Sequence, residues 1–84
     1  MSFRFTKHAK NRMAERDITE QEVLHAIDFP DRMHVSTKTT KRFVAKKLMR
    51  TNRGHHLLMV IYEINGQETV VITIIDTSKI EKYY

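Results

Sequence analysis

The stretch that decides the fold is residues 55–76, HHLLMVIYEINGQETVVITIID. Its central pair, Asn65-Gly66, is typical of a two-residue type I′ turn, because both central residues of that turn need a positive φ. Apolar runs flank the pair on both sides, so the stretch predicts an antiparallel β-hairpin. A loop of this length fixes the strand register. The predicted partners are Ile64 with Gln67, Tyr62 with Thr69, and Leu58 with Thr73.

Side chains alternate across a sheet, which divides the hairpin into two faces. One face is apolar except near the turn, and we expect it to form the core under the helices. It carries Leu57, Met59, Ile61, Val70, Ile72 and Ile74. The other face mixes apolar and polar groups, and we interpret it as the floor of a site or as a partner surface. It carries His56, Leu58, Val60, Tyr62, Thr69, Val71, Thr73 and Ile75.

Two short helices are predicted before the strands. Residues 7–16 follow Thr6, a typical N-cap residue, and contain apolar residues at helical spacing. The second helix begins at Thr19, which forms a capping-box pattern with Glu22. It ends before Pro30, because the residue that precedes a proline is disfavoured in the α region.

The remaining strands are less regular. Residues 32–36 predict a short edge strand, and a Thr/Lys-rich turn follows at 37–40. Residues 41–50 predict a strand with a β-bulge at Lys46-Lys47, where the alternation shifts. We therefore expect one α+β domain over residues 1–84, with an N-terminal helical hairpin packed on one face of a three- to four-stranded antiparallel sheet. The C-terminal tail, a second copy or a partner protein is expected to cover part of the other face.

Composition excludes several classes of protein. There is no cysteine, which excludes disulfides, a thiolate zinc site and a catalytic thiol. No stretch approaches the ~18 apolar residues of a membrane helix, and the N-terminus lacks the apolar region of a signal peptide. We therefore expect a soluble, cytoplasmic protein with no membrane partner.

The formal charge of +5 is unevenly distributed, since no acidic residue lies between Asp31 and Glu63. A field of one sign favours a polyanion, with nucleic acid as the first candidate and an acidic protein as the second. A basic surface that is merely solvated is the alternative. The candidate nucleic-acid contacts are Lys41, Arg42, Lys46, Lys47, Arg50, Arg53, Tyr62, Thr73 and Tyr83. For the tyrosines and the threonine, ordinary packing is the alternative role.

The candidate catalytic residues are His8, Arg12 and Arg16, which recur every four residues along one side of the first helix. Histidine can transfer protons near neutral pH, and arginine can stabilise the charge of a phosphorane without a metal ion. The alternative is that the arginines pair with neighbouring carboxylates and that the histidine packs at the helix start. His55 and His56 point to opposite faces of a strand and cannot chelate together, so we predict no metal site and no cofactor.

Three segments carry a family resemblance: FTKHAKNRMAERDITEQEVLHAI at 5–27, VVITIID at 70–76 and SKIEKYY at 78–84. They resemble a bacterial family catalogued as domain of unknown function 4258. Its opening motif His-Ala-x-x-Arg-Met is followed by Glu-Arg-x-Ile-[Ser/Thr]. The matching residues are His8, Ala9, Arg12 and Met13, then Glu15, Arg16, Ile18 and Thr19. Asp17 stands where the family often has glycine.

That family is distantly similar to bacterial toxin ribonucleases of the RelE and BrnT type. The similarity implies two helices on an antiparallel sheet, metal-independent cleavage of RNA, and an acidic antitoxin that covers the basic face. It also implies catalysis by His8, Arg12 and Arg16, with Lys41 and Arg42 as phosphate contacts.

Three functions therefore stay open at this stage. The first is a toxin-like endoribonuclease, or an inactive relative of one. The second is a nucleic-acid-binding module without catalysis, and the third is a protein-interaction domain that forms a homodimer or binds an acidic partner. Fold-level similarity alone does not decide among them.

Overall fold

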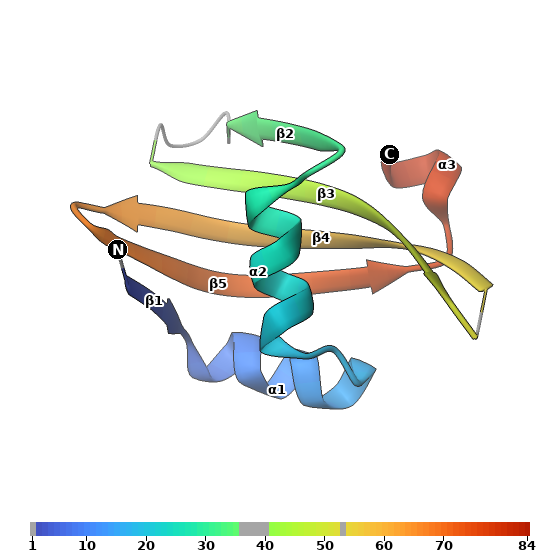
Figure 1. The fold of residues 1–84 in the computed structure, drawn as a ribbon, viewed down its shortest axis with the longest axis horizontal. Helices are drawn as coiled ribbons and strands as arrows, with labels where there is room; N and C mark the ends of the chain where they lie inside the picture. The colour runs from blue at the N-terminus through green and yellow to red at the C-terminus, as the bar shows by residue number, and fades with distance from the viewer. Residues whose placement is uncertain (1, 36–40, 53) are drawn as a thin grey trace.

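The computed structural model describes residues 2–35, 41–52 and 54–84. The predicted turn at 37–40 and the predicted phosphate contact Arg53 lie outside these residues. Within them the chain is an α+β fold with a five-stranded mixed sheet and three helices (Figure 1). The elements in order are β1 Ser2–Phe5, α1 Lys7–Arg16, α2 Glu20–Asp28, β2 Arg32–Val35, β3 Arg42–Thr51, β4 Gly54–Asn65, β5 Glu68–Thr77 and α3 Ile80–Tyr83.

The strand order is β1-β5-β4-β3-β2, so the central strands are β4 and its two neighbours. β1 pairs with β5 in parallel, and the other pairs are antiparallel. The sequence therefore predicted too few strands, three or four instead of five, and did not indicate the parallel pair. β1 is only four residues long and lies far in sequence from its partner, so no local pattern indicated the pairing.

The helices α1 and α2 begin where their caps predict. The Thr6 hydroxyl accepts a hydrogen bond from the amide of Ala9 at 3.1 Å. Thr19 and Glu22 form both bonds of a capping box, which confirms that prediction. α1 packs against β5, and α2 packs against β4 and β3. Figure 1 shows α1 running along β5 while α2 crosses the strands, so the two helices do not form the predicted antiparallel hairpin.

The hairpin of β4 and β5 is confirmed, but its turn is displaced by one residue. Asn65 pairs with Glu68, which leaves Gly66 and Gln67 as the two loop residues. Gly66 has a φ of 62°, whereas Asp17 is the only described non-glycine residue with a positive φ. A positive φ at the first central position alone is typical of a type II′ turn, so the predicted type I′ turn is wrong.

A β-bulge in β5 changes the register again. Tyr62 pairs with Val71, but the adjacent Ile61 pairs with Thr73, so Ile72 is an extra residue. Strand β3 pairs with β4 without a shift from Arg42 to Thr51, so the bulge predicted at Lys46-Lys47 is absent there. Beyond Ile72 every side chain of β5 points to the face opposite to the predicted one.

The core under the helices lies on the face that was predicted to be open. The β4 residues that pack there are Leu58, Val60 and Tyr62, together with Ala9 and Met13 of α1, Val23 and Ala26 of α2, and Ile18 between the two helices. Both faces of β4 are apolar, so composition did not distinguish them. Leu57, Met59 and Val70 on the other face are also buried.

The C-terminal segment lies on this second face. The Lys46 ammonium, which points away from the helices because its neighbour Ala45 is in the core, donates a hydrogen bond of 2.6 Å to the carbonyl oxygen of Tyr83. The guanidinium of Arg32 lies 4.3 Å from the centre of the Tyr84 ring. The tail is one of the three coverings expected from the sequence. None of the described helices has the length and apolar character needed to cross a membrane.

We predict that Leu58→Ala lowers the free energy of unfolding by about 2–5 kcal/mol, because Leu58 is fully buried under the helices. Leu48→Ala is the matched control, since Leu48 lies on the other face and is 42% exposed, and its cost should stay below about 1 kcal/mol. Urea denaturation measures both. Equal losses would contradict the assignment of the main core to the helical face.

Asp17 ends α1 in the left-handed conformation, with φ 57° and ψ 43°. Glycine adopts this conformation without the steric cost that a side chain incurs. We predict that Asp17→Gly is more stable than Asp17→Ala by about 1 kcal/mol, measured by urea denaturation. At the exposed helical position Ala14 the order should reverse, with Ala14→Gly costing about 1 kcal/mol. Equal stability of the two Asp17 variants would contradict the prediction.

Candidate functional site

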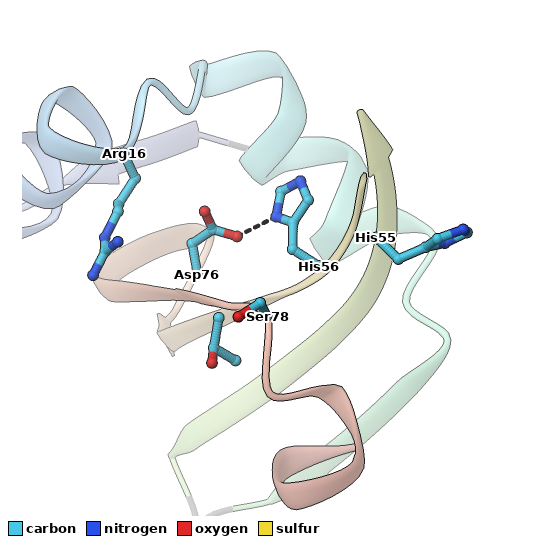
Figure 2. A pocket seen from close by; sticks show the side chains of 6 residues that line it. Arg16, His55, His56, Asp76 and Ser78 are labelled. Carbon is cyan, nitrogen blue, oxygen red and sulfur yellow. Dashed lines mark hydrogen bonds and ion pairs between the residues drawn. The ribbon is translucent and has the colours of Figure 1, made fainter. Parts of the chain in front are cut away.

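A polar pocket of about 190 Å³ lies at the end of the sheet where β4 begins and β5 ends. Its lining residues come from three segments that are distant in sequence, and Figure 2 shows them together: Arg16, His55, His56, Asp76, Thr77 and Ser78. The antiparallel hairpin places the first residues of β4 beside the last residues of β5. α1 runs along β5, so its last residue, Arg16, reaches the same end.

The centre of the pocket is a histidine–carboxylate pair. Nδ1 of His56 and Oδ1 of Asp76 form a hydrogen bond, and the two side chains are only 11% and 12% exposed. Asp76 pairs with Leu58 across the strands, so His56 is its diagonal neighbour. The bulge at Ile72 is required for this contact, because without it Asp76 would point to the opposite face.

The second ring nitrogen of His56 distinguishes this pair from a catalytic triad. Nε2 is buried and has no hydrogen-bond partner in the described part of the chain. Ser78 lines the same pocket, but a serine nucleophile needs a hydrogen bond to the base that activates it. The geometry therefore supplies a histidine–carboxylate pair and not a Ser–His–Asp nucleophile.

Arg16 brings a cation to the pocket. Its side chain is exposed, and within residues 2–35, 41–52 and 54–84 it makes no ion pair, which leaves the guanidinium available to an anion. The alternative of pairing with Glu22 does not occur, since that carboxylate caps α2. An arginine beside a histidine–carboxylate pair is an arrangement that can bind a phosphate and move a proton next to it.

The structure brings only one of the three predicted catalytic residues into this pocket. His8 is exposed near the start of α1, about 12 Å from Arg16 along the helix axis. Arg12 is half-buried, and its Nε is buried without a partner among the residues described. His56 and Asp76 were not predicted. A histidine at the start of one strand and a carboxylate at the end of the next could have indicated the pair. The predicted register lacked the bulge at Ile72, however, and placed the two side chains on opposite faces of the sheet.

Most of the predicted cationic contacts on β3 have intramolecular partners. Arg42 pairs with Glu63 at 2.8 Å, Lys47 with Asp31 at 3.9 Å, and Lys46 with the Tyr83 carbonyl. Arg50 is exposed, as is Lys41 just before the strand. The basic interval is therefore divided between the two faces, and two of its described cations, Arg42 and Lys47, pair with carboxylates.

Tyr62 and Thr73 do not share a face, contrary to the prediction. Tyr62 is buried in the core, where its ring stacks on Phe43 at 5.5 Å between centroids and its hydroxyl donates to the sulfur of Met33. Burial raises the pKa of the Tyr62 hydroxyl above its usual value. Thr73 is half-buried on the opposite face, and Tyr83 is exposed on α3. Tyr62, a predicted nucleic-acid contact, therefore lies in the core and not on an exposed face.

A metal site needs several ligands within reach of one point. In the parts of the chain described here, no group of three His, Cys, Asp or Glu residues is placed to hold an ion. The pocket itself offers two histidines and one carboxylate, but Figure 2 shows His55 pointing away from the pair formed by His56 and Asp76.

These features define a small, basic α+β domain with a polar pocket built around a histidine–carboxylate pair. The family model described as Domain of unknown function (DUF4258) matches residues 5–81. The chain belongs to this family, which confirms the resemblance seen in its opening motif. Comparisons with curated proteins and with solved structures return no match. The similarity to RelE- and BrnT-type toxins stays a prediction.

We predict that the His56–Asp76 contact is energetically coupled. Asp76→Ala should cost about 1–3 kcal/mol of unfolding free energy, because it leaves both ring nitrogens of His56 unpaired. In a double-mutant cycle with His56→Ala, the coupling energy should reach about 1 kcal/mol. Glu15→Ala, an exposed acid on α1, is the control and should stay within about 0.5 kcal/mol of the wild type. Additive losses would show that the contact does not form in solution.

Proposed function

We propose that this protein is a toxin-like, metal-independent endoribonuclease of the RelE/BrnT kind, active in the cytoplasm. The observation that carries the proposal is the buried His56–Asp76 pair in a pocket that also holds the unpaired Arg16. When the 2′-hydroxyl of RNA attacks its own phosphodiester bond, the reaction requires a group that transfers protons and a cation near the phosphate. A histidine held by a carboxylate, next to an arginine, provides both. The net charge of +5 supports an RNA ligand.

The proposed reaction uses the 2′-hydroxyl of RNA as its nucleophile. The hydroxyl loses its proton to a base as its oxygen forms a bond to the adjacent phosphorus. The bond from phosphorus to the 5′ oxygen of the next nucleotide breaks, and that oxygen takes a proton from an acid. The products are a 2′,3′-cyclic phosphate and a 5′-hydroxyl, so the step consumes no water and no cofactor.

Three residues of the pocket have a role in this proposal. The His56–Asp76 pair accepts and returns the proton, with the carboxylate holding the imidazole in one orientation. Arg16 neutralises the charge that builds up on the phosphorane oxygens. Electrostatic stabilisation of this kind is usually the largest single contribution to the rate. The N-terminal motif of the family includes Arg16, and this gives that motif a place in the pocket.

A non-catalytic RNA-binding module is the second candidate. It is favoured by the burial of His56 Nε2 in the free protein, where Nδ1 is already occupied by Asp76. On this proposal the pair only stabilises the end of the hairpin, and Arg16 binds a backbone phosphate. The two candidates differ in whether the pocket changes the RNA that it holds.

We predict that the purified protein cleaves RNA in the presence of EDTA and leaves 2′,3′-cyclic phosphate ends. Arg16→Ala and His56→Gln should each lower the rate by about 10²-fold or more, because they remove the cation and the proton carrier. His34→Ala and Lys7→Ala are the controls, as both residues are exposed and lie outside the pocket. Circular dichroism and urea denaturation establish that each variant is folded.

Three outcomes separate the alternatives. Equal activity of folded His56→Gln and wild type would exclude the proposed site. Loss of activity in His8→Ala but not in His56→Gln would move catalysis to the start of α1. RNA binding without cleavage, unaffected by His56→Gln, would establish the non-catalytic module.

A further inference from the structure

We propose that Arg50 and His55 form a second phosphate-binding position beside the pocket, and that the ligand is therefore single-stranded RNA held by consecutive phosphates. The inference deepens the proposed function and rests on the same pocket. It assigns a role to His55, which the chemistry of the His56–Asp76 pair does not use.

The strand register places these two residues together. Arg50 on β3 and His55 on β4 are direct cross-strand partners, so their side chains leave the same face with Cβ atoms about 4.5–5.5 Å apart. Both residues are exposed, and His55 also lines the pocket. Figure 2 shows Arg16 and His55 on opposite sides of the His56–Asp76 pair. Side chains alternate along β4, so His55 and Arg50 lie on the face of the sheet opposite to His56 and Asp76. A chain bound at Arg16 thus passes around the end of the sheet to reach His55 and then Arg50.

Charge supports this path. In the described part of β3, Arg42, Lys46 and Lys47 each have a partner within the molecule, whereas the Arg50 side chain makes no ion pair or hydrogen bond there. Among the described residues that line the pocket, the one carboxylate, Asp76, is engaged by His56. A free guanidinium next to an exposed imidazole matches the donor geometry that phosphate oxygens accept.

The shape of the site favours a single strand over a duplex. His56 and Asp76 form the wall of a hollow, and they are nearly buried, so a nucleotide must bend out of a helical stack to approach them. An A-form duplex holds its backbone in a fixed geometry, whereas a single strand can splay. Among the described residues, no Phe, Tyr or Trp lines the pocket to stack on a base. The contacts are then to phosphate and sugar, which gives little sequence preference.

Binding can be measured without cleavage. A fluorescently labelled ten-nucleotide RNA with 2′-O-methyl groups has no nucleophile, and its anisotropy reports binding in EDTA at several salt concentrations. Arg50→Ala should weaken binding about tenfold and reduce the slope of log affinity against log salt by about 0.7. His55→Ala should weaken it about twofold or more. Lys7→Ala, which removes the same charge from the exposed start of α1, is the matched control and should have less than about a twofold effect.

Two further ligands test whether the loss of affinity in Arg50→Ala arises at the second phosphate-binding position and whether the site prefers a single strand. A dinucleotide with one phosphate should bind wild type and Arg50→Ala equally, since it does not reach the second position. A 2′-O-methyl duplex of the same sequence should bind more weakly than the single strand. A duplex that binds as tightly would overturn the assignment to single-stranded RNA.

The test separates this inference from the proposed activity. If the wild type binds the single strand and Arg50→Ala behaves like Lys7→Ala, the second position is wrong and the ribonuclease proposal stands. If Arg50→Ala shows the expected loss but unmodified RNA is not cleaved, the second position stands and the catalytic proposal is wrong. A wild type that does not bind RNA overturns both.

Discussion

Ile72 is an extra residue in β5, inserted opposite the step from Ile61 to Tyr62 in β4. The direction of every side chain from Ile72 to the end of β5 depends on this insertion. A bulge of one residue rotates the following residues to the other face. It therefore turns Ile74 into the core and brings Asp76 to His56. The same residue links the packing of the domain to the chemistry of its pocket, because the core and the pair occupy successive positions on one face of β5.

The surrounding apolar residues hold the His56–Asp76 pair in place, because the burial of such a pair is itself costly. Burying a charged or polar pair costs solvation, and the attraction between the partners does not always offset that cost. His56 also leaves Nε2 buried without a partner, which adds to the cost. The apolar residues of β4, such as Leu58 and Val60, supply the compensating burial. A buried polar pair with an unpartnered nitrogen is expected at functional sites, where local rules are broken for chemistry.

Features that depend on residues close in sequence were predicted correctly. Features that depend on the pairing of distant segments were missed. Thr6, Thr19 and Glu22 act within one turn of a helix, and Asn65-Gly66 indicated the hairpin, so these elements were found. The displaced turn and the extra Ile72 are features of the pairing between β4 and β5, and β1 pairs across most of the chain. For the site, Arg16 was identified from its helical spacing. The contact between His56 and Asp76 required the true register, and two equally apolar faces of β4 gave no means to find it.

The position of the free cations, rather than the net charge, decides where an anion can bind. The excess of +5 suggested a broad basic surface, yet Glu63, Asp31 and the Tyr83 carbonyl each engage a cation of β3. Exposed pairs contribute little to stability, but they lower the local potential that a polyanion experiences. Arg16 and Arg50 come from different elements and remain unpaired within the described residues. Because His55 lines the pocket that contains Arg16 and is the cross-strand partner of Arg50, both unpaired arginines lie near the end of the sheet that holds the His56–Asp76 pair, which is where the proposed function places the phosphates.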